Sequence, residues 1–270
     1  MKTKLHFQRF EFKYLLNQKQ EALVKNFIRP YLKRDGFAEG LPNGEYEVVS
    51  LYYDSPSLFF YHQKIDGVKK RKKIRLRTYR NRGKFHENAF FEIKRKNDAV
   101  VLKDRFLINS CDYDQLIRRN GLLKGGEKVD GLEDELRQEL RHDIYKHSAS
   151  PTLLVVYNRE PYVGKYTPYL RITFDKNIRA RTDNELFYKN DEFTDVSPNT
   201  TVMEIKFSGT LPVYIHKAIK MFNLQRISYS KYCQGIERCG IISRLGVYQS
   251  YYKNNNMSLV NKKQEICSIL

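Results

Sequence analysis

The chain has 270 residues, of which 41% are hydrophobic and 30% are charged, and its 49 Lys and Arg outnumber its 31 Asp and Glu to give a net charge of +18. This composition excludes a disordered chain and provides enough apolar surface for a large core. The excess of positive charge requires a polyanionic partner, which can be a nucleic acid, a membrane surface or a phosphate-rich small molecule.

Hydropathy and cysteine spacing narrow the class of protein further. No apolar run approaches the roughly 18–20 residues that span a bilayer, and the first residues lack the apolar stretch of a signal peptide, so we expect a cytoplasmic protein. Cys111, Cys233, Cys239 and Cys267 show neither CxxC spacing nor a Cys/His zinc pattern. These spacings argue against a disulfide scaffold and against a structural zinc site.

The hydrophobic patterning predicts eight strands and five helices in one domain over residues 1–245, followed by a polar tail over 246–270. In chain order, the predicted elements are a strand at 7–14, a helix at 18–33, a strand at 45–54, a helix at 55–65, strands at 70–80, 88–96 and 99–107, helices at 112–120 and 130–147, strands at 152–160, 168–175 and 201–207, and a helix at 212–223. Asp54 and Ser55 are the expected cap of the second helix.

The positive charge is concentrated in one segment and follows the two-residue period of strands. Residues 64–105 contain 16 Lys and Arg but only 5 Asp and Glu. Successive side chains of a strand point to opposite faces, so Lys73, Arg75 and Arg77 share one face while Ile74 and Leu76 share the other. The same alternation of charged and apolar residues recurs in the other predicted strands.

The pattern Glu-x-Lys occurs on three predicted strands, at Glu11-x-Lys13, Glu92-x-Lys94 and Glu204-x-Lys206. An ordinary sandwich with a solvated polar face explains any single strand of this kind. The polar faces taken together, however, consist almost entirely of long cations with a few carboxylates. A sheet rolled into a barrel, with these faces inward and the apolar faces covered by helices, would form a charged tunnel.

Such a tunnel requires a strongly anionic ligand to relieve its self-repulsion. Arg and Lys match phosphate oxygens, Arg by its planar fork and Lys as a point charge. Carboxylates among the cations add nothing to the binding of a nucleic-acid backbone, but they suit a divalent cation that bridges a triphosphate. The residues therefore favour a triphosphate or polyphosphate ligand with a bound metal ion.

The charged motifs, taken in order, resemble those of the VTC domain, the polyphosphate polymerase domain of the vacuolar transporter chaperone complex and a member of the triphosphate tunnel metalloenzymes. The resemblance covers roughly residues 7–240 and implies an α+β fold built on an eight-stranded antiparallel β tunnel. The matching motifs are Arg9-x-Glu11-x-Lys13-Tyr14, Ser50-x-Tyr52-Tyr53-Asp54, Arg75-x-Arg77-x-Tyr79, Glu92-x-Lys94, Lys103-x-Arg105, Tyr157-Asn158-Arg159, Arg171-x-x-x-Asp175, Glu204-x-Lys206 and Ser230-Lys231-Tyr232.

The resemblance also implies roles for individual side chains. The implied catalytic residues are Arg75, Arg77, Lys94, Arg159, Arg171 and Lys206, the implied phosphate-binding residues are Arg9, Lys13, Lys73, Lys103, Arg105, Ser230 and Lys231, and the implied ligands of Mn²⁺ or Mg²⁺ are Glu204, Glu92 and Glu11. The tunnel enzymes commonly open with Glu-x-Glu-x-Lys, whereas Arg9 takes the place of the first acid here. The loss of that carboxylate favours the handling of a polymer over simple hydrolysis of triphosphate.

The expected activity is the transfer of the γ-phosphate of ATP to phosphate or to a growing polyphosphate chain. Two alternatives stay open, which are a triphosphate or polyphosphate hydrolase of the same fold and a non-catalytic module that binds polyphosphate or, less readily, RNA. ATP and polyphosphate are the expected partners and DNA is not, while peripheral association with a membrane partner and the oligomeric state are left open.

Overall fold

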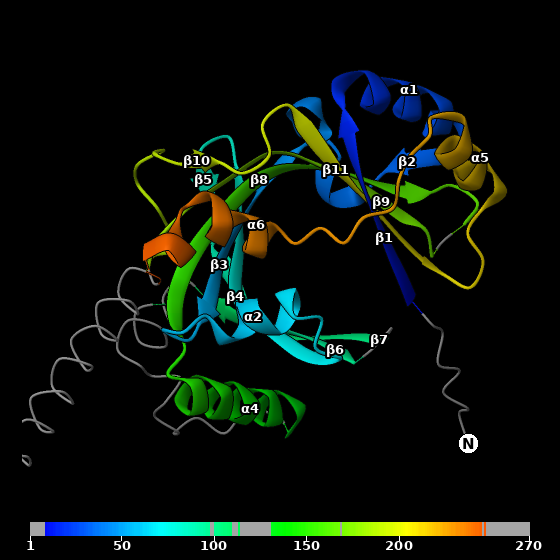
Figure 1. The fold of residues 1–270 in the computed structure, drawn as a ribbon. Coiled ribbons are helices and arrows are strands. Elements are labelled where there is room, and N and C mark those ends of the chain that lie inside the picture. Colours follow the sequence, from blue (N-terminus) through cyan, green and yellow to red (C-terminus); the bar gives the residue numbers. More distant parts are fainter. Residues whose placement is uncertain are drawn as a thin grey trace, which may run out of the picture.

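The computed structural model of the chain describes residues 9–97, 100–109, 113, 131–167, 169–244 and 246, with the side chains of Arg9, Val100 and Leu132 excepted. One large antiparallel sheet forms the body of the protein, and helices pack on it, so the fold is α+β as expected (Figure 1). Among the described helices, none combines the length and the apolar character needed to cross a bilayer.

All eight predicted strands are present, and they lie side by side in the order β1-β11-β9-β8-β3-β4-β6-β7, with every neighbouring pair antiparallel. The sequence did not predict three short strands. Of these, β2 pairs with β8, β5 pairs with β4, and β10 pairs with β9. The strands are β1 (Arg9–Asn17), β2 (Leu32–Arg34), β3 (Tyr46–Asp54), β4 (Lys70–Asn81), β5 (Lys84–Phe85), β6 (Asn88–Asn97), β7 (Val100–Asn109), β8 (Ser150–Gly164), β9 (Arg171–Arg181), β10 (Thr194–Asp195) and β11 (Thr200–Ser208).

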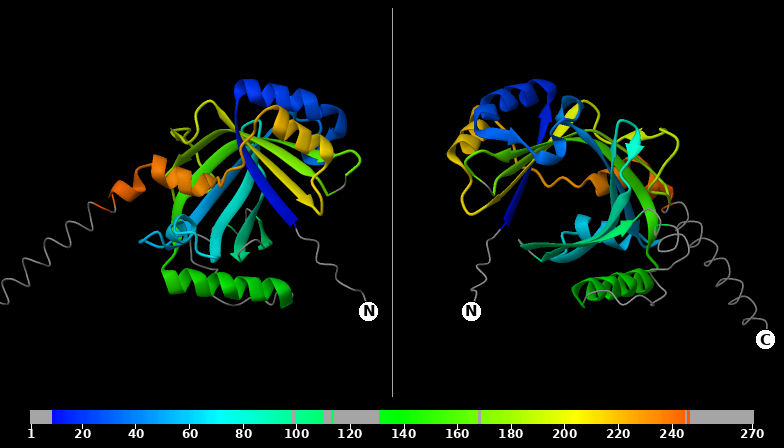
Figure 2. Two further views of the ribbon diagram at one scale, coloured as in Figure 1. Left: turned by 45° about the vertical axis from the view of Figure 1, so that its right-hand side comes forward. Right: turned by 180° about the vertical axis from the view of Figure 1, so that it is seen from behind.

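The sheet bends into an arch but does not close into the tunnel that the sequence predicted (Figure 2). Strands β1 and β7 are the two ends of the order, and no backbone pairing joins them among the described residues. The free edge of β1 is partly occupied instead, because Ile227 donates its N–H to the carbonyl of Lys13 (2.9 Å) and Arg226 pairs with Tyr14. The result is an open sheet with a concave and a convex face.

The predicted alternation of charged and apolar side chains is confirmed in strand β4. Ile74 and Leu76 are fully buried on the convex side, where they pack with Phe91. Arg75 and Arg77 point to the concave side, where both line a cavity. The two-residue period of the strands therefore sends the charged rows to one face of the sheet and the core to the other.

Helices cover the convex face from two sides (Figure 2). Leu136 and Leu140 of α4 (Gly131–His147) pack over the strands around β4 and β6. Val24 of α1 (Gln18–Ile28) and Ile215 of α5 (Val213–Met221) cover β1, β9 and β11. This burial of apolar surface on the outside of the arch leaves the concave face free for charged groups.

Two predicted helices are shorter than expected. The helix expected over 18–33 ends at Ile28, because Pro30 lies in a 3₁₀ turn (Arg29–Tyr31) and residues 32–34 form β2. The helix expected over 55–65 begins only at α2 (Phe59–Ile65). The N-cap residue of α2 is Leu58 and not Asp54 or Ser55, but the buried carboxylate of Asp54 still accepts the N–H groups of Phe60 and Tyr61 in the first turn at 2.9 Å each. The predicted helix at 112–120, except Tyr113, and the tail beyond Gly246 lie outside the described residues.

Helix α6 (Lys231–Arg238) was not predicted, and it packs against one end of the concave face. Ile236 and Cys233 contact an apolar group of strand residues that includes Leu153 and Val155. The hydroxyl of Tyr232 donates to Asp54 at 2.5 Å and so ties α6 to the start of α2. Apolar side chains therefore fill the concave face at this end, beside the charged rows.

Gly235 allows α6 to approach the sheet closely. A Cβ atom at this position would lie 2.7 Å from a methyl carbon of Leu153 and 3.1 Å from Cβ of Ala180. We expect Gly235→Ala to lower the free energy of unfolding by about 1–3 kcal/mol through overpacking, although the same change ordinarily stabilises a helix. Urea denaturation measures the change. Gly131→Ala in α4, where a Cβ meets nothing within 4 Å, is the matched control, and equal stability of both variants would contradict the expected role.

Candidate anion-binding cavity

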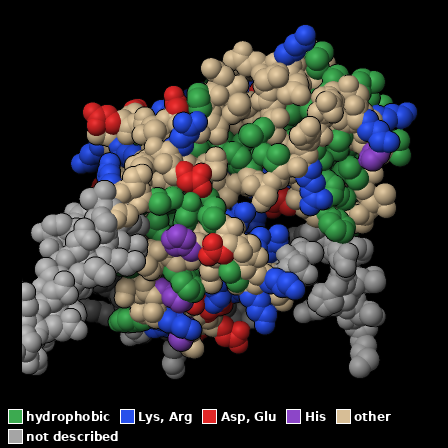
Figure 3. All heavy atoms as spheres, in the orientation of Figure 1, with side chains coloured by type: hydrophobic (Ala, Val, Ile, Leu, Met, Phe, Trp, Pro, Cys, Tyr) green, Lys and Arg blue, Asp and Glu red, His purple; other side chains and the backbone are tan. Residues whose placement is uncertain are grey.

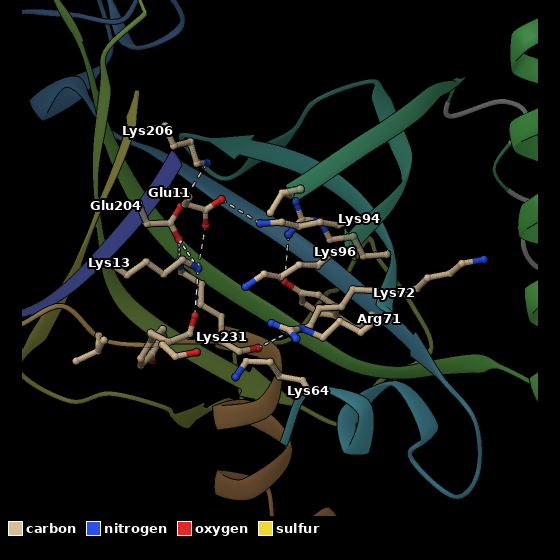
Figure 4. A pocket seen from close by; sticks show the side chains of 18 of the residues that line it. Glu11, Lys13, Lys64, Arg71, Lys72, Lys94, Lys96, Glu204, Lys206 and Lys231 are labelled. Atoms are coloured by element: carbon tan, nitrogen blue, oxygen red, sulfur yellow. Dashed lines mark hydrogen bonds and ion pairs between the residues drawn. The ribbon is translucent and has the colours of Figure 1, made fainter. Parts of the chain in front are cut away.

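A cavity of about 460 Å³ lies on the concave face of the sheet, next to the first turn of α6. Figure 3 shows Lys and Arg side chains gathered where this side of the molecule is hollowed. Two carboxylates, Glu11 and Glu204, also line the cavity (Figure 4). The thirteen cationic residues of the lining are Lys13, Lys64, Arg71, Lys72, Lys73, Arg75, Arg77, Lys94, Lys96, Arg159, Lys206, Arg226 and Lys231.

One wall of the cavity is organised around Asp175 of β9, which is fully buried. Its two carboxylate oxygens accept Nε and a terminal nitrogen of Arg159 on the neighbouring β8, at 2.7 and 2.8 Å. The same carboxylate accepts the ammonium group of Lys231 at 2.5 Å. A bidentate carboxylate of this kind fixes the plane of the guanidinium, so Arg159 and Lys231 are already oriented toward the cavity.

The ammonium group of Lys13 lies between the two cavity carboxylates. Its nitrogen is 3.2 Å from an oxygen of Glu11 and 3.3 Å from an oxygen of Glu204, which also accepts Lys231 at 3.0 Å. Burial would raise the pKa of the Glu204 carboxyl, but the charges of Lys13 and Lys231 outweigh burial and hold this pKa well below its usual value. Both carboxylates are therefore ionised throughout the physiological range.

Glu11 also connects β1 at one end of the open sheet to β6 near the other end. Its second oxygen lies 3.0 Å from the ammonium group of Lys94, so a side chain of β1 pairs with a side chain of β6. Burial raises the pKa of Glu11, yet Lys94 and Lys13 together shift it far below its ordinary value. An ion pair thus links the two sides of the concave face where the backbone does not.

The opposite wall holds Arg75 and Arg77, and Glu92 fixes their positions. Glu92 is almost fully buried and accepts Nε of Arg75 at 2.7 Å, while a terminal nitrogen of Arg77 lies 3.9 Å away. Nε of Arg77 donates to the hydroxyl of Ser50 at 3.2 Å. Lys103 pairs with the other oxygen of Glu92 at 2.5 Å. The two guanidinium groups are consequently held in place before any ligand arrives.

Lys73 differs from Lys13 and Lys94 because its closest described partners are neutral. Its ammonium group donates to the hydroxyl of Ser230 at 2.6 Å and lies near the ring of Tyr232. Burial is the main cause that lowers the pKa of Lys73 to about 8, and the charges of Lys13 and Lys94 lower it further. Ser230 is also the N-cap of α6, so it couples this lysine to the first turn of the helix.

The carboxylates of the cavity fit a hard divalent cation only together with phosphate oxygens. Among the described residues, no group of three or more His, Cys, Asp or Glu is arranged to hold a metal ion. Mg²⁺ is commonly bound by one or two carboxylates plus substrate phosphates, a role that suits Glu11 and Glu204. Lys13 lies between them, so a metal ion held by both carboxylates would take the place of this ammonium group.

The structure brings most of the predicted site residues into the cavity. The lining includes these eleven: Glu11, Lys13, Lys73, Arg75, Arg77, Lys94, Arg159, Glu204, Lys206, Ser230 and Lys231. Four others lie outside the lining, which are Glu92, Lys103, Arg105 and Arg171. Glu92 is enclosed by Arg75 and Lys103, with which it pairs. Arg105 is exposed, with its guanidinium 4.5 Å from the centre of the Phe90 ring, and Arg171 pairs with Asp35 at 3.3 Å. The side chain of Arg9 lies outside the described residues.

Several residues of the cavity were not predicted. Tyr52 and Tyr157 line it and bind arginines, since Arg75 donates to the hydroxyl of Tyr52 at 3.2 Å. Their alternation with Ser50 and Arg159 could have placed them on the same face. Lys72 is also among the lining residues, but its ammonium group pairs with Asp143 of α4 at 2.7 Å. No strand pattern indicates the segment 226–229, because it has no strand of its own.

The fold and the cavity define a bent antiparallel sheet whose concave face carries rows of arginine and lysine around one cavity. The model of the VTC domain family matches residues 8–239, and the chain belongs to this family. A comparison with curated proteins finds no match.

Two solved structures are similar to this chain over most of its length. The PH1819 protein of Pyrococcus horikoshii OT3 is 14% identical, with a TM-score of 0.43 over 84% of this chain and 96% of that one. The putative adenylyl cyclase HpAC1 of Hippeastrum, described as having a dominant triphosphatase activity, is 12% identical, with a TM-score of 0.44 over 86% of this chain and 95% of that one.

The position of Glu92 predicts the effect of its removal. We expect Glu92→Gln to lower the free energy of unfolding by about 3 kcal/mol, because it leaves buried cations without their counter-charge. The metal concentration that gives half-maximal activity should not change, since Glu92 does not line the cavity. Chemical denaturation and a metal titration of activity measure the two effects. Glu204→Gln is the comparison that should shift the metal requirement, and a similar shift with Glu92→Gln would contradict this placement.

Lys73 predicts a pH dependence of anion binding. Its pKa is about 8 in the folded protein, so the ammonium group is charged below pH 8 and becomes neutral above it. We expect the affinity for tripolyphosphate to be constant at lower pH and to fall above pH 8, by up to about tenfold per pH unit for each lysine that loses its proton. Titration calorimetry measures this fall.

The lowered pKa of Lys73 has the opposite effect on the stability of the protein without a ligand, which should increase above pH 8. Since the unfolded chain keeps the proton of Lys73 up to its ordinary pKa, the free protein should become more stable between pH 8 and that value. Lys73→Arg stays charged and should reduce the loss of affinity above pH 8. An affinity that stays constant from pH 7 to about pH 10 in the unmodified protein would contradict the role of Lys73.

Proposed function

We propose that the cavity binds the triphosphate of ATP together with a polyphosphate chain and transfers the γ-phosphate to the end of that chain, with release of ADP. The observation that supports this proposal is the convergence of cations from both walls on one cavity, with two ionised carboxylates among them. Membership of the VTC domain family supports a function on polyphosphate or triphosphate.

The reaction needs little covalent help from the protein. A bond forms between an oxygen of the acceptor phosphate and the γ-phosphorus, and the bond from the γ-phosphorus to the β–γ bridging oxygen breaks, so that its electron pair leaves with ADP. The acceptor oxygen is already ionised, so no general base is required. Catalysis then depends on in-line positioning and on stabilising charge at the oxygens of the transferred group.

Arginines and lysines of both walls are in position to supply this stabilisation. Arg75 and Arg77 approach from β4, and Arg159 and Lys206 approach from the other wall. Carboxylates hold Arg75 and Arg159 before a ligand binds, so no reorganisation is needed when charge develops. Lys94 and Lys13 can exchange their carboxylate partners for phosphate oxygens. We propose no role in the transfer for Arg171, Lys103 or Arg105, which lie outside the lining.

Glu204 and Glu11 would hold the divalent cation, Mn²⁺ or Mg²⁺, in contact with the phosphates. A metal ion bound there neutralises phosphate charge and polarises the bonds of the transferred group. Its contribution adds to that of the surrounding ammonium groups. We do not propose Glu92 as a ligand, because Arg75 and Lys103 already occupy its two oxygens.

One incubation tests the proposed activity against its alternatives. The purified protein is mixed with ATP and Mn²⁺, and ADP, free phosphate and long-chain polyphosphate are all measured. Formation of ADP together with polymer is the expected result. Free phosphate without polymer would identify a hydrolase, and no turnover despite stabilisation by tripolyphosphate would identify a binding module. Either of these two results would contradict the proposed polymerase.

Substitution of Arg77 is the most direct single test of the proposed phosphoryl transfer. Its buried guanidinium lines the cavity and would face the transferred phosphate. We expect Arg77→Ala to reduce ATP-dependent polyphosphate formation by roughly 10²- to 10³-fold, the loss of about 3–4 kcal/mol of transition-state stabilisation. Initial rates of polymer formation measure it. Arg80→Ala is the control, because Arg80 lies on the same strand but pairs with Glu47 away from the cavity. Full activity of Arg77→Ala would exclude this residue from the mechanism.

A further inference from the structure

Exposed tyrosines gather at one end of the molecule, where the turn between β8 and β9 meets the 3₁₀ turn Arg29–Tyr31 and the start of α5 (Figure 1). Tyr166 of the β8–β9 turn is 84% exposed, and Tyr169 of the same turn is 64% exposed. Val213, the first residue of α5, is 70% exposed. Large aromatic and aliphatic side chains that gather in this way on a surface commonly mark a site of interaction.

Contacts between the three segments hold these side chains in one patch. The rings of Tyr31 and Tyr214 stack, with 4.2 Å between their centroids and 13° between their planes. The backbone N–H of Lys165 donates to the carbonyl of Tyr31 at 2.9 Å, and the hydroxyl of Tyr214 interacts with the side chain of Thr167. Lys165 and Thr167 flank Tyr166 in the chain, so both neighbours of this exposed ring are held in place.

The segments that form this end of the molecule are basic and lack acids. Residues 22–34, 161–174 and 209–224 contain no Asp or Glu. Their exposed cations include Arg29, Lys33, Lys165, Lys217 and Lys220. The patch of tyrosines therefore lies within a region of positive charge, which selects a negatively charged partner.

Helix α5 presents basic and apolar side chains together on its outer face. Ile215 and Ala218 are buried and cover the sheet. Val213, Lys217 and Met221 follow each other at a spacing of four residues, so they lie on one side of the helix, and all three are exposed. Figure 3 shows hydrophobic and basic side chains next to each other over this helix.

This combination of side chains matches the interface of an anionic membrane. A tyrosine at such an interface places its ring among the lipids and its hydroxyl at the headgroups, while Lys and Arg attract anionic headgroups. A site for a nucleic-acid backbone would gain nothing from exposed aliphatic residues such as Val213 and Met221. The β8–β9 turn also protrudes from the body of the protein, so a flat surface can reach it (Figure 2).

We propose that this end of the molecule binds the surface of a membrane that contains anionic lipids. We call it the tyrosine tip and define it as Tyr31, Tyr166, Tyr169, Val213, Lys165, Lys217 and Lys220. The aromatic and aliphatic side chains enter the interface, and the lysines contact the anionic headgroups. The proposal does not rest on the proposed function, because none of these residues lines the cavity.

A tryptophan reporter tests lipid contact directly, because the chain contains no tryptophan of its own. Tyr166→Trp places the reporter in the tyrosine tip. Tyr145 is 66% exposed on α4, away from the tip, so Tyr145→Trp is the matched control (Figure 1). Vesicles of phosphatidylcholine alone are compared with vesicles in which phosphatidylglycerol replaces part of it. We expect the emission of Tyr166→Trp to shift to shorter wavelength only with the anionic vesicles, and that of Tyr145→Trp to stay unchanged.

A second comparison separates the tyrosine tip from the general positive charge of the protein. The double variant Lys217→Glu with Lys220→Glu acts in the tip, and Lys70→Glu with Lys84→Glu changes the net charge equally at exposed positions of β4 and β5. Each lysine close to an anionic membrane contributes about fivefold to binding, and salt screens the attraction beyond about 10 Å. Cosedimentation with anionic vesicles should therefore weaken by about thirtyfold or more in the tip variant and change little in the control. Circular dichroism and thermal unfolding verify that both are folded.

Three results would overturn the proposal. These are equal emission shifts of Tyr166→Trp and Tyr145→Trp, an equal loss of vesicle binding in the two charge variants, and no binding of the unmodified protein to anionic vesicles. A tip variant that loses binding to a homopolymeric RNA but keeps its binding to vesicles would also contradict it, because the tip would then recognise nucleic acid. Polyphosphate formation is measured without vesicles, so the proposed activity and the membrane contact succeed or fail separately.

Discussion

Buried carboxylates that each hold several cations are the interaction on which this site depends. Asp175 fixes Arg159 and Lys231, Glu92 fixes Arg75, and Glu204 holds Lys13. An enclosed row of cations without such partners would repel itself and would be expelled toward solvent. The acids therefore allow a strongly basic surface to exist in the folded protein before any phosphate is bound. In the proposed reaction, they would also hold the positive groups toward the phosphates.

The sheet provides the geometry that this charge arrangement requires. Its apolar side chains face outward under α1, α4 and α5, which inverts the usual order in which a sheet presents charge to solvent and apolar groups to the interior. The inversion works because helices supply the apolar contacts on the outside. Helix α6 then fills one end of the concave face and presents Ser230 and Lys231 to the cavity. The convex core thus carries most of the packing, and the concave face is left for binding.

The two-residue period of strands explains why much of the site could be predicted. It places Lys13, Arg77 and Lys206 on one face from local sequence alone, and it also gave the eight strands of the main sheet. The period does not reveal how far each side chain lies from the cavity. Glu92 shares the face of Lys94 but is enclosed by its neighbours, and Arg105 lies on the edge strand β7. Such differences depend on the curvature of the whole sheet.

Contacts between distant segments were beyond prediction for the same reason. The α6 segment contains Lys, Tyr, Gln and Glu with few apolar residues, and its position is set by partners far away in the chain. The free edge of β1 is partly occupied by Arg226 and Ile227, which reach it from more than two hundred residues away. Sequence periodicity carries no information about such partners.

The carboxylate of Asp54 at the start of α2 gives this protein a sensitivity far from its cavity. Asp54 accepts the amides of Phe60 and Tyr61 and the hydroxyl of Tyr232, although neither Asp54 nor Tyr232 lines the cavity. Tyr232 follows Lys231 directly in the chain. Displacement of the Tyr232 phenol would therefore tilt the first turn of α6, which presents Ser230 and Lys231 to the cavity. A random mutagenesis screen for inactive protein would therefore recover changes at Asp54, and a geneticist could mistake this scaffold position for part of the chemistry.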